Sequence, residues 1–190
     1  VEDSIITSCQ IPIFKAFNVS DMDAFSHYEQ MDEVVGFVMD AAVPGSGKTF
    51  DWDLLQKNVA RIHARGNIHQ HLDLIAGLPY EDFNTFKKSF CDVYAMKPDQ
   101  FQLGFLKVLD GSFMNEKRND YEIQASSLPP YEIFSTKWLS YEDVLSLKGV
   151  EEMVEVYYNS FQFAASMIYL ERLFKDAYCP VSYTHLTLPT

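Results

Sequence analysis

Asp40 is the first residue whose type and position could do chemistry. It ends the apolar run Val34–Asp40 and stands just before a glycine-rich loop. An acid at the C-terminal end of a buried strand is well placed for proton transfer, although acid–base catalysis also needs a partner base within reach. Asp40 is therefore a candidate general acid, and the alternative is that it only caps the loop.

The loop Ala42–Thr49 nearly fits the phosphate-binding pattern G-x-x-x-x-G-K-[ST], with Ala42 in place of the first glycine. We expect the following helix to begin at Asp51 or Asp53. A carboxylate at a helix N-terminus occupies the position that a phosphate would take. The sequence therefore favours a plain glycine-rich connection over an ATP or GTP site.

Histidines at three nearby positions raise the question of a metal. His69 and His71 are two residues apart, so on a strand they share a face, while His63 belongs to the preceding helix. Catalytic metal sites usually need three protein ligands. We therefore expect polar, hydrogen-bonded positions and no metal.

Composition excludes several classes of protein. The formal net charge is −12, which makes nucleic acid a poor partner, and 47% of the residues are hydrophobic, which is enough for a core. No apolar run approaches a membrane span, and the start at Val1 lacks the features of a signal peptide. Three widely spaced cysteines suit a reducing compartment. We expect a cytoplasmic protein, and the start without Met indicates a fragment.

The elements that must position these residues alternate along the chain. Predicted strands and helices follow one another as strand 11–19, strand 34–40, helix 51–66, strand 71–77, helix 83–94 and strand 101–108. Helices at 141–148 and 151–174 follow, with the aromatic residues of 157–174 expected to pack in the core. The fold class is α/β: an incomplete (β/α) barrel of parallel strands, followed by a mainly α-helical C-terminal region.

The runs Ile13–Phe17, Phe37–Asp40 and Pro44–Trp52 resemble one known family. Residues 11–55 are similar to the middle of phosphoribosylanthranilate isomerase, a (β/α)8 barrel of tryptophan biosynthesis. The resemblance implies that Asp40 is the general acid of an Amadori rearrangement. The family's catalytic cysteine and its later phosphate-binding loops have no counterpart here.

Other runs resemble a second family; they are Asn58–His63, His69–Asp82, Gln102–Leu109, Pro129–Glu132, Lys137–Tyr141 and Glu151–Ser160. Residues 53–175 look like radical SAM proteins that carry an N-terminal cobalamin-binding domain and a C-terminal domain of unknown function. The resemblance implies that the intact parent uses S-adenosylmethionine, a 4Fe-4S cluster and cobalamin. Its substrate, expected to be a small molecule, is unknown.

The second resemblance also implies a cofactor-binding strand. Asp73, Ile75, Gly77 and Glu81 match the family's fifth-strand pattern G-x-I-x-G-x-x-x-E, with Asp at the first glycine. This strand would lie behind the adenine of S-adenosylmethionine; the alternative is a buried strand followed by a proline turn. The C-x3-C-x2-C motif that holds the cluster is missing from the sequence. We expect no cofactor to bind this chain stably, and no activity from it alone.

The predicted organisation is an isomerase-like βαβ fragment at 1–55, a radical SAM partial barrel at 56–112, a helical domain at 113–176 and a tail at 177–190. The join within 51–56 is either an assembly artefact or a natural chimera, and the segment 180–190 resembles translated adapter sequence. The competing functions are a radical SAM fragment, an isomerase fragment and a non-catalytic helical interaction module. Exposed barrel edges predict self-association.

Overall fold

The computed structural model describes residues 13–18, 22–28, 30–40, 51–64, 66, 68–174, 178 and 181. It divides the chain into two compact units, Val1–Ile68 and His69–Thr190. The glycine-rich loop at 42–49 and the tail at 182–190 lie outside the described residues. Of the helices that are described, none combines the length and the hydropathy that a bilayer crossing requires.

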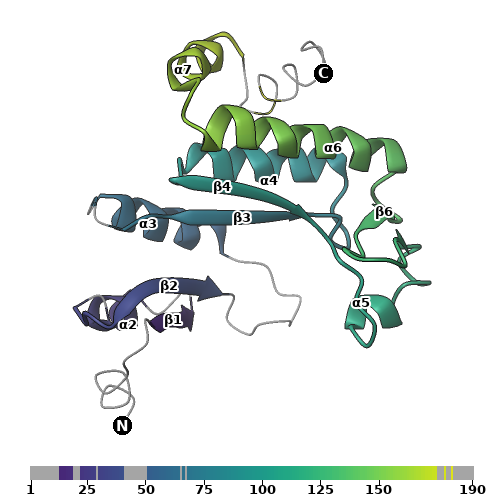
Figure 1. Cartoon of the computed structure of the whole chain (residues 1–190), viewed down its shortest axis with the longest axis horizontal. Coiled ribbons are helices and arrows are strands. Elements are labelled where there is room, and N and C mark those ends of the chain that lie inside the picture. Colours follow the sequence, from purple (N-terminus) through teal and green to yellow (C-terminus); the bar gives the residue numbers. More distant parts are fainter. Residues whose placement is uncertain are drawn as a thin grey trace. The chain divides into compact units, whose positions relative to one another are not determined.

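The first unit contains the elements β1 (Ile13–Asn18), α2 (Met22–Tyr28), β2 (Val34–Asp40) and α3 (Trp52–His63) (Figure 1). Strands β1 and β2 are parallel, and Asn18 lies opposite Asp40 at their C-terminal ends. The parallel pairing with a helical crossover confirms the predicted α/β arrangement of this segment.

Helix α3 begins where an acid caps it. The Asp51 carboxylate accepts a hydrogen bond from the Leu54 N–H at 3.1 Å, so a carboxylate stands at this helix N-terminus, as predicted. Arg61 donates to the Ser26 hydroxyl at 3.3 Å and thereby joins α3 to α2. The helix ends at His63, three residues before Gly66, the residue that was predicted to end it.

The second unit begins with a parallel strand–helix–strand motif. Its elements are β3 (His71–Ala76), α4 (Phe83–Ala95) and β4 (Gln100–Phe105). Asp82 and Thr85 form a reciprocal capping box that starts α4, with both hydrogen bonds at 2.8 Å. These bounds agree with the predicted elements to within one residue, except that the last strand is shorter than predicted.

The rest of the second unit is mainly helical. It comprises α5 (Phe113–Glu116), β5 (Gln124–Ala125), β6 (Ile133–Ser135), α6 (Tyr141–Met153), the π-helix η1 (Val154–Asn159) and α7 (Ala164–Leu173). Strands β5 and β6 form a short antiparallel pair. Within the described part of the chain, each sheet has two strands, so a complete barrel is not present there.

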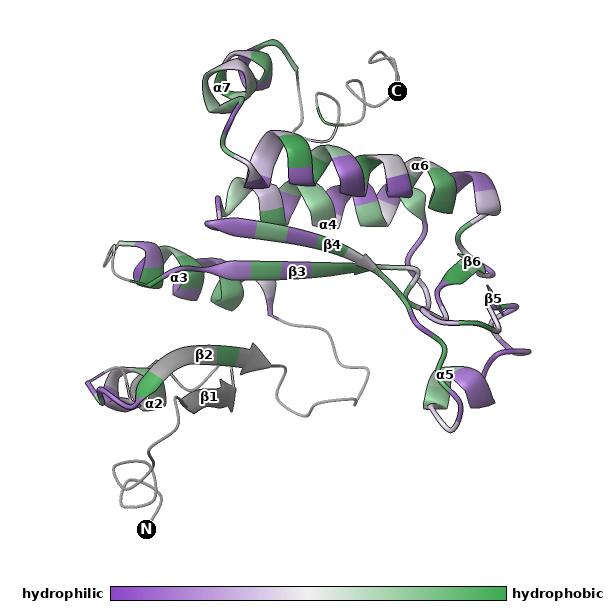
Figure 2. Ribbon diagram, in the orientation of Figure 1, coloured by the Kyte–Doolittle hydropathy of each residue, from purple (hydrophilic) through white to green (hydrophobic). Residues whose placement is uncertain are grey.

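The core of the second unit lies between β3–β4 and the helices α4 and α6, which cover one face of that sheet (Figure 1). Its fully buried side chains include Phe86, Phe90, Phe101, Leu139 and Leu147. Hydrophilic and hydrophobic residues both occur along β3 and β4 (Figure 2), because alternate side chains point to opposite faces.

The C-terminal helices differ from the prediction. Helix α6 continues through Gly149 to Met153, and the π-helix follows without a gap. The interruption comes later, before α7, where Phe161 adopts a φ of 57°. Tyr157 and Tyr158 pack against the core as predicted, but Tyr169 is 63% exposed, so the predicted core role of the aromatic residues holds only in part.

Helix α7 is attached to α4 by a partly buried polar contact. The Tyr94 hydroxyl donates to Glu171 Oε1 at 2.6 Å, and Lys97 Nζ donates to the same oxygen at 2.7 Å. Burial opposes ionisation of Glu171, but the hydrogen bonds from Lys97 and Tyr94 outweigh it and lower the pKa of this carboxyl.

We predict that Glu171→Gln lowers stability at neutral pH by less than about 1 kcal/mol, because half-exposed ion pairs contribute little. A carboxyl whose pKa is lowered by folding stabilises the protein above its unfolded pKa, and this stability is lost as the pH falls through the folded pKa. The difference in the free energy of unfolding between Glu171→Gln and wild type should therefore vanish in acid. Denaturant unfolding across this pH range measures it, with the exposed Glu152→Gln as control; an unchanged difference in acid would contradict the prediction.

Candidate functional site

The sheet of the second unit has one face that the helices do not cover. His71, Asp73 and Ile75 alternate along β3 and are exposed, Ile75 by 44%, whereas Leu72 and Leu74 pack against the core. The neighbouring positions on β4 are polar or small, with Gln102 opposite Asp73 and Gly104 opposite Ile75. In a (β/α) barrel the face opposite the helices is the interior, where substrates and cofactors bind near the C-terminal strand ends. We call this surface the open face of β3–β4.

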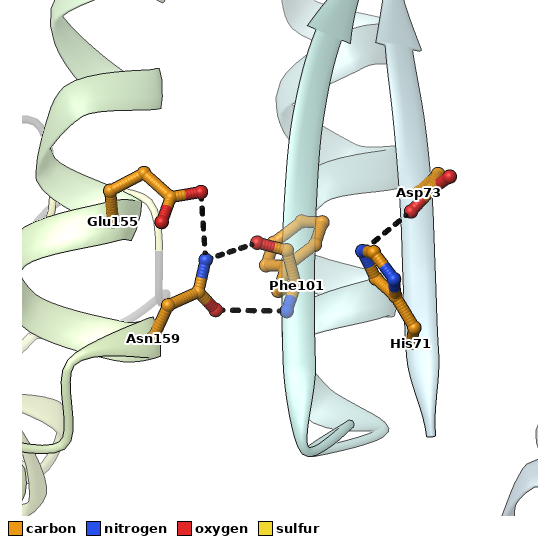
Figure 3. Close-up of polar contacts among 5 residues, drawn as sticks. All are labelled: His71, Asp73, Phe101, Glu155 and Asn159. Carbon is orange, nitrogen blue, oxygen red and sulfur yellow. Dashed lines mark hydrogen bonds and ion pairs between the residues drawn. The ribbon is translucent and has the colours of Figure 1, made fainter. Parts of the chain in front are cut away.

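On the open face, His71 and Asp73 contact each other. His71 Nε2 lies 3.0 Å from Asp73 Oδ1, two residues further along the strand (Figure 3). The predicted polar, hydrogen-bonded role is thus confirmed for His71. A carboxylate in this position favours the imidazole form with its proton on Nε2, which leaves Nδ1 as a proton acceptor. Both side chains are well exposed, so the contact adds little to stability.

Gly77 follows β3 with a backbone conformation that favours glycine. Its φ is +92°, and a Cβ added there would overlap Ile133 Cδ1 and lie 3.3 Å from Ile133 Cγ1. The group that approaches Gly77 closely is thus the side chain of a β6 residue. The requirement for glycine at this position is explained by packing as well as by the left-handed backbone.

Glu81 stands at the start of α4, near the C-terminal end of β3. Its carboxylate accepts a hydrogen bond from the Ser89 hydroxyl at 3.0 Å. Burial raises the pKa of Glu81; the Ser89 hydrogen bond opposes this rise, and the charge of Asp82 adds to it. Glu81 is therefore more easily protonated than an ordinary glutamate, which suits a group that accepts and returns a proton.

Three aromatic residues cluster beside this turn, although no local sequence pattern indicates that they meet. The Tyr80 ring centroid lies 4.8 Å from that of Trp138 and 6.0 Å from that of Tyr121. A hydrogen bond with Tyr80 raises the pKa of Tyr121. Tyr80 has a φ of 69° and is 74% exposed, so an aromatic surface faces solvent next to the end of β3.

A pocket of about 360 Å³ lies at the opposite end of the sheet, where β4 begins. Its lining residues are His69, Asp99, Gln100, Glu155, Asn159, Ser160 and Phe161. Asp99 accepts a hydrogen bond from the Gln70 N–H at 2.7 Å. The pocket does not include the residues that the sequence predicted for cofactor binding.

The other residues that the sequence predicted lie on elements other than β3. Asp40 is the last residue of β2 in the first unit, at the C-terminal end of a parallel strand as expected. Cys91 lies on α4, while Cys9 and Cys179 fall outside the described residues. Among the residues with described positions, no three His, Cys, Asp or Glu side chains come together as a metal-ligand set.

The fold and site define a mixed α/β protein in which parallel strands precede a helical C-terminal region. Two family models match separate parts of it. The model described as N-(5'-phosphoribosyl)anthranilate (PRA) isomerase matches residues 2–75. The model described as a protein of unknown function (DUF4080) matches residues 119–179. No curated protein matches the chain.

These matches confirm that the chain combines two differently related segments. The isomerase match extends to residue 75 and so includes most of β3, although residues 69–82 resemble radical SAM proteins. The structure pairs β3 with β4 and places both strands in the second unit. We therefore treat β3 as part of the second unit. The segment 180–190 lies outside both matches.

Proposed function

We propose that residues 69–178 are the C-terminal part of a radical SAM enzyme that acts on a small-molecule substrate. In the intact parent, Asp73, Ile75, Gly77 and Glu81 would hold the adenosyl part of S-adenosylmethionine. The single observation that carries the proposal is the open face of β3–β4, which is polar and lies opposite α4 and α6. The DUF4080 match to the adjoining helices supports it.

The chain's own residues do not fit the iron–sulfur cluster of such an enzyme. A four-iron cluster is held by closely spaced thiolates, whereas this chain has cysteines at positions 9, 91 and 179. We therefore assign no radical step to it. The cobalamin would belong to the separate N-terminal domain that the resemblance implies for the parent.

The residues that remain have binding and proton-transfer roles in this proposal. The end of β3 would bind the adenine, and the exposed ring of Tyr80 offers a surface on which a planar base can stack. His71, oriented by Asp73 at 3.0 Å, would face the substrate side of the sheet and accept a proton at Nδ1.

A second candidate function has its own support. The isomerase match covers the first unit, and Asp40 stands at the C-terminal end of β2, where a barrel enzyme places its catalytic groups. Here Asp40 would donate a proton to the sugar-derived substrate. The isomerase family's partner base is missing from the sequence, so we expect no measurable isomerase turnover.

The radical SAM proposal can be tested with adenosine, which contains the adenine without needing a cluster. In NMR titrations of the full chain, we expect weak, saturable shifts confined to residues 75–81 and to the start of the loop after β4. Ribose serves as the control ligand, because it lacks the base. Tyr80→Ala should weaken the response, and Tyr169→Ala, at a similarly exposed tyrosine on α7, should not. Shifts no larger with adenosine than with ribose would contradict the proposal.

A further inference from the structure

The pocket at the start of β4 is formed by segments that are far apart in the sequence. One wall is the entry to β4, which includes Asp99, and the other is the π-helix η1, which supplies Glu155 and Asn159. All of the lining residues belong to the second unit. The volume of about 360 Å³ is at the lower end of the range for small-molecule sites. A ligand here would lie at the opposite end of the sheet from Gly77 and Glu81.

The Asn159 side chain joins the two walls. It accepts from the Phe101 N–H at 3.0 Å and donates to the Phe101 carbonyl at 2.9 Å, so it bonds to this edge of β4 as the backbone of a neighbouring strand would (Figure 3). Its second amide hydrogen is donated to Glu155 Oε1 at 3.0 Å. Asn159 therefore orients Glu155, whose other carboxylate oxygen has no hydrogen-bond partner among the described residues.

A second carboxylate on the opposite wall is in a similar state. Asp99 Oδ2 accepts from the Gln70 N–H at 2.7 Å, and Asp99 Oδ1 has no partner in the part of the chain that the structure describes. The ion pairs of the second unit are made by other acids; these are Asp73, Asp120, Glu132, Glu151 and Glu171. The pocket thus carries two negative charges that no described cation offsets.

Phe161 adds an aromatic surface to the pocket, and its backbone is strained. It lines the pocket with its side chain 63% exposed, and its φ of 57° is uncommon for a residue other than glycine, asparagine or aspartate. Strained residues and π-helices both occur frequently at functional sites, and here the two are adjacent. The face of an aromatic ring attracts a cation. Phe161 and the two carboxylates therefore favour the same kind of ligand.

We propose that this pocket binds a small aliphatic polyamine, whose ammonium groups pair with Asp99 and Glu155 and whose chain lies against Phe161. An organic cation is preferred to a metal ion, because no three His, Cys, Asp or Glu side chains converge as ligands among the residues with described positions. The inference goes beyond the proposed function, since it uses neither the end of β3 nor S-adenosylmethionine.

NMR titration of the full chain with 1,4-diaminobutane tests the site, and 1,4-butanediol is the control because it has the same length without the charges. We expect saturable shifts of the backbone amides of residues 69, 99–101 and 155–161 with the diamine, and none with the diol. The chain has a formal net charge of −12, so cations also associate weakly with its surface. Shifts that do not saturate, or that spread equally over other acidic residues, would overturn the proposal.

Two pairs of variants separate this site from general surface charge. Glu155→Gln keeps the acceptor for Asn159 but removes the charge, so it should raise the dissociation constant about two- to fivefold, whereas the exposed Glu152→Gln should not. Phe161→Leu should weaken binding by a similar factor, whereas Phe163→Leu, outside the pocket, should not. Equal affinities within either pair would refute the assigned site. The adenosine titration reports on residues 75–81, so its outcome is independent of this one.

Discussion

Replacing Gly77 by valine should destabilise the second unit by about 2–5 kcal/mol, the sum of an unfavourable backbone and an overpacked contact. The φ of +92° is disfavoured for any side chain and most of all for a β-branched one. The new Cβ would also overlap the tip of Ile133, which is 2% exposed and has little room to move.

Thermal or denaturant unfolding measures the effect of the Gly77 substitution, and Gly104 provides a matched control. A Cβ added at Gly104 meets nothing within 4 Å, so Gly104→Ala should change stability by less than about 1 kcal/mol. Combining Gly77→Val with Ile133→Ala should remove the overlap but not the backbone strain. Equal effects at the two glycines would show that the turn after β3 does not have the described conformation.

Replacing Asn159 by leucine should cost about 2–4 kcal/mol, because it leaves both backbone groups of Phe101 without their side-chain partner in a partly buried place. Leucine is similar in size to asparagine, so the loss of stability reflects the missing hydrogen bonds more than a change in side-chain volume. Amide exchange of Phe101, followed by NMR, should accelerate together with the loss of stability.

A second substitution at Asn159 separates the effect of charge from the effect of side-chain shape. Asn159→Asp loses the donor to the Phe101 carbonyl and places a carboxylate beside Glu155, so it should be unstable at neutral pH and recover partly in acid. Asn84→Leu, at an exposed position of α4, is the control and should have little effect. Unchanged exchange of the Phe101 amide in Asn159→Leu would contradict the role of Asn159 at this edge.

Local sequence patterns predicted most of the helices and strands in the first half of the second unit. The apolar run at 71–77 predicted β3, and the turn that begins at Pro79 predicted the start of α4. Asp51 at the start of α3 was also predicted, because N-capping depends on residues only three positions apart. The predicted end of β4 was too late, since Leu106 and Val108 continue as extended chain but pair with the segment around β6.

The break between η1 and α7 could not be predicted from local signals. No proline or glycine marks the turn at Phe161, and Gly149, which did invite a break, lies buried inside α6. A buried glycine allows close packing against other elements, so tertiary contacts outweigh its weak helix propensity. The exposed residues of α7 were likewise predicted to be buried, because helical spacing alone cannot show whether a partner surface exists.

The sequence by itself determined the α/β class, the two family resemblances and the short-range motifs, since each depends on neighbouring residues or on long matching runs. Only the tertiary structure decided which residues act together. Asn159 is 58 positions from the Phe101 backbone that it closes, and Tyr80, Tyr121 and Trp138 meet only after the chain has folded. Side-chain contacts over such separations depend on how the elements pack, and a single sequence carries no local pattern for them.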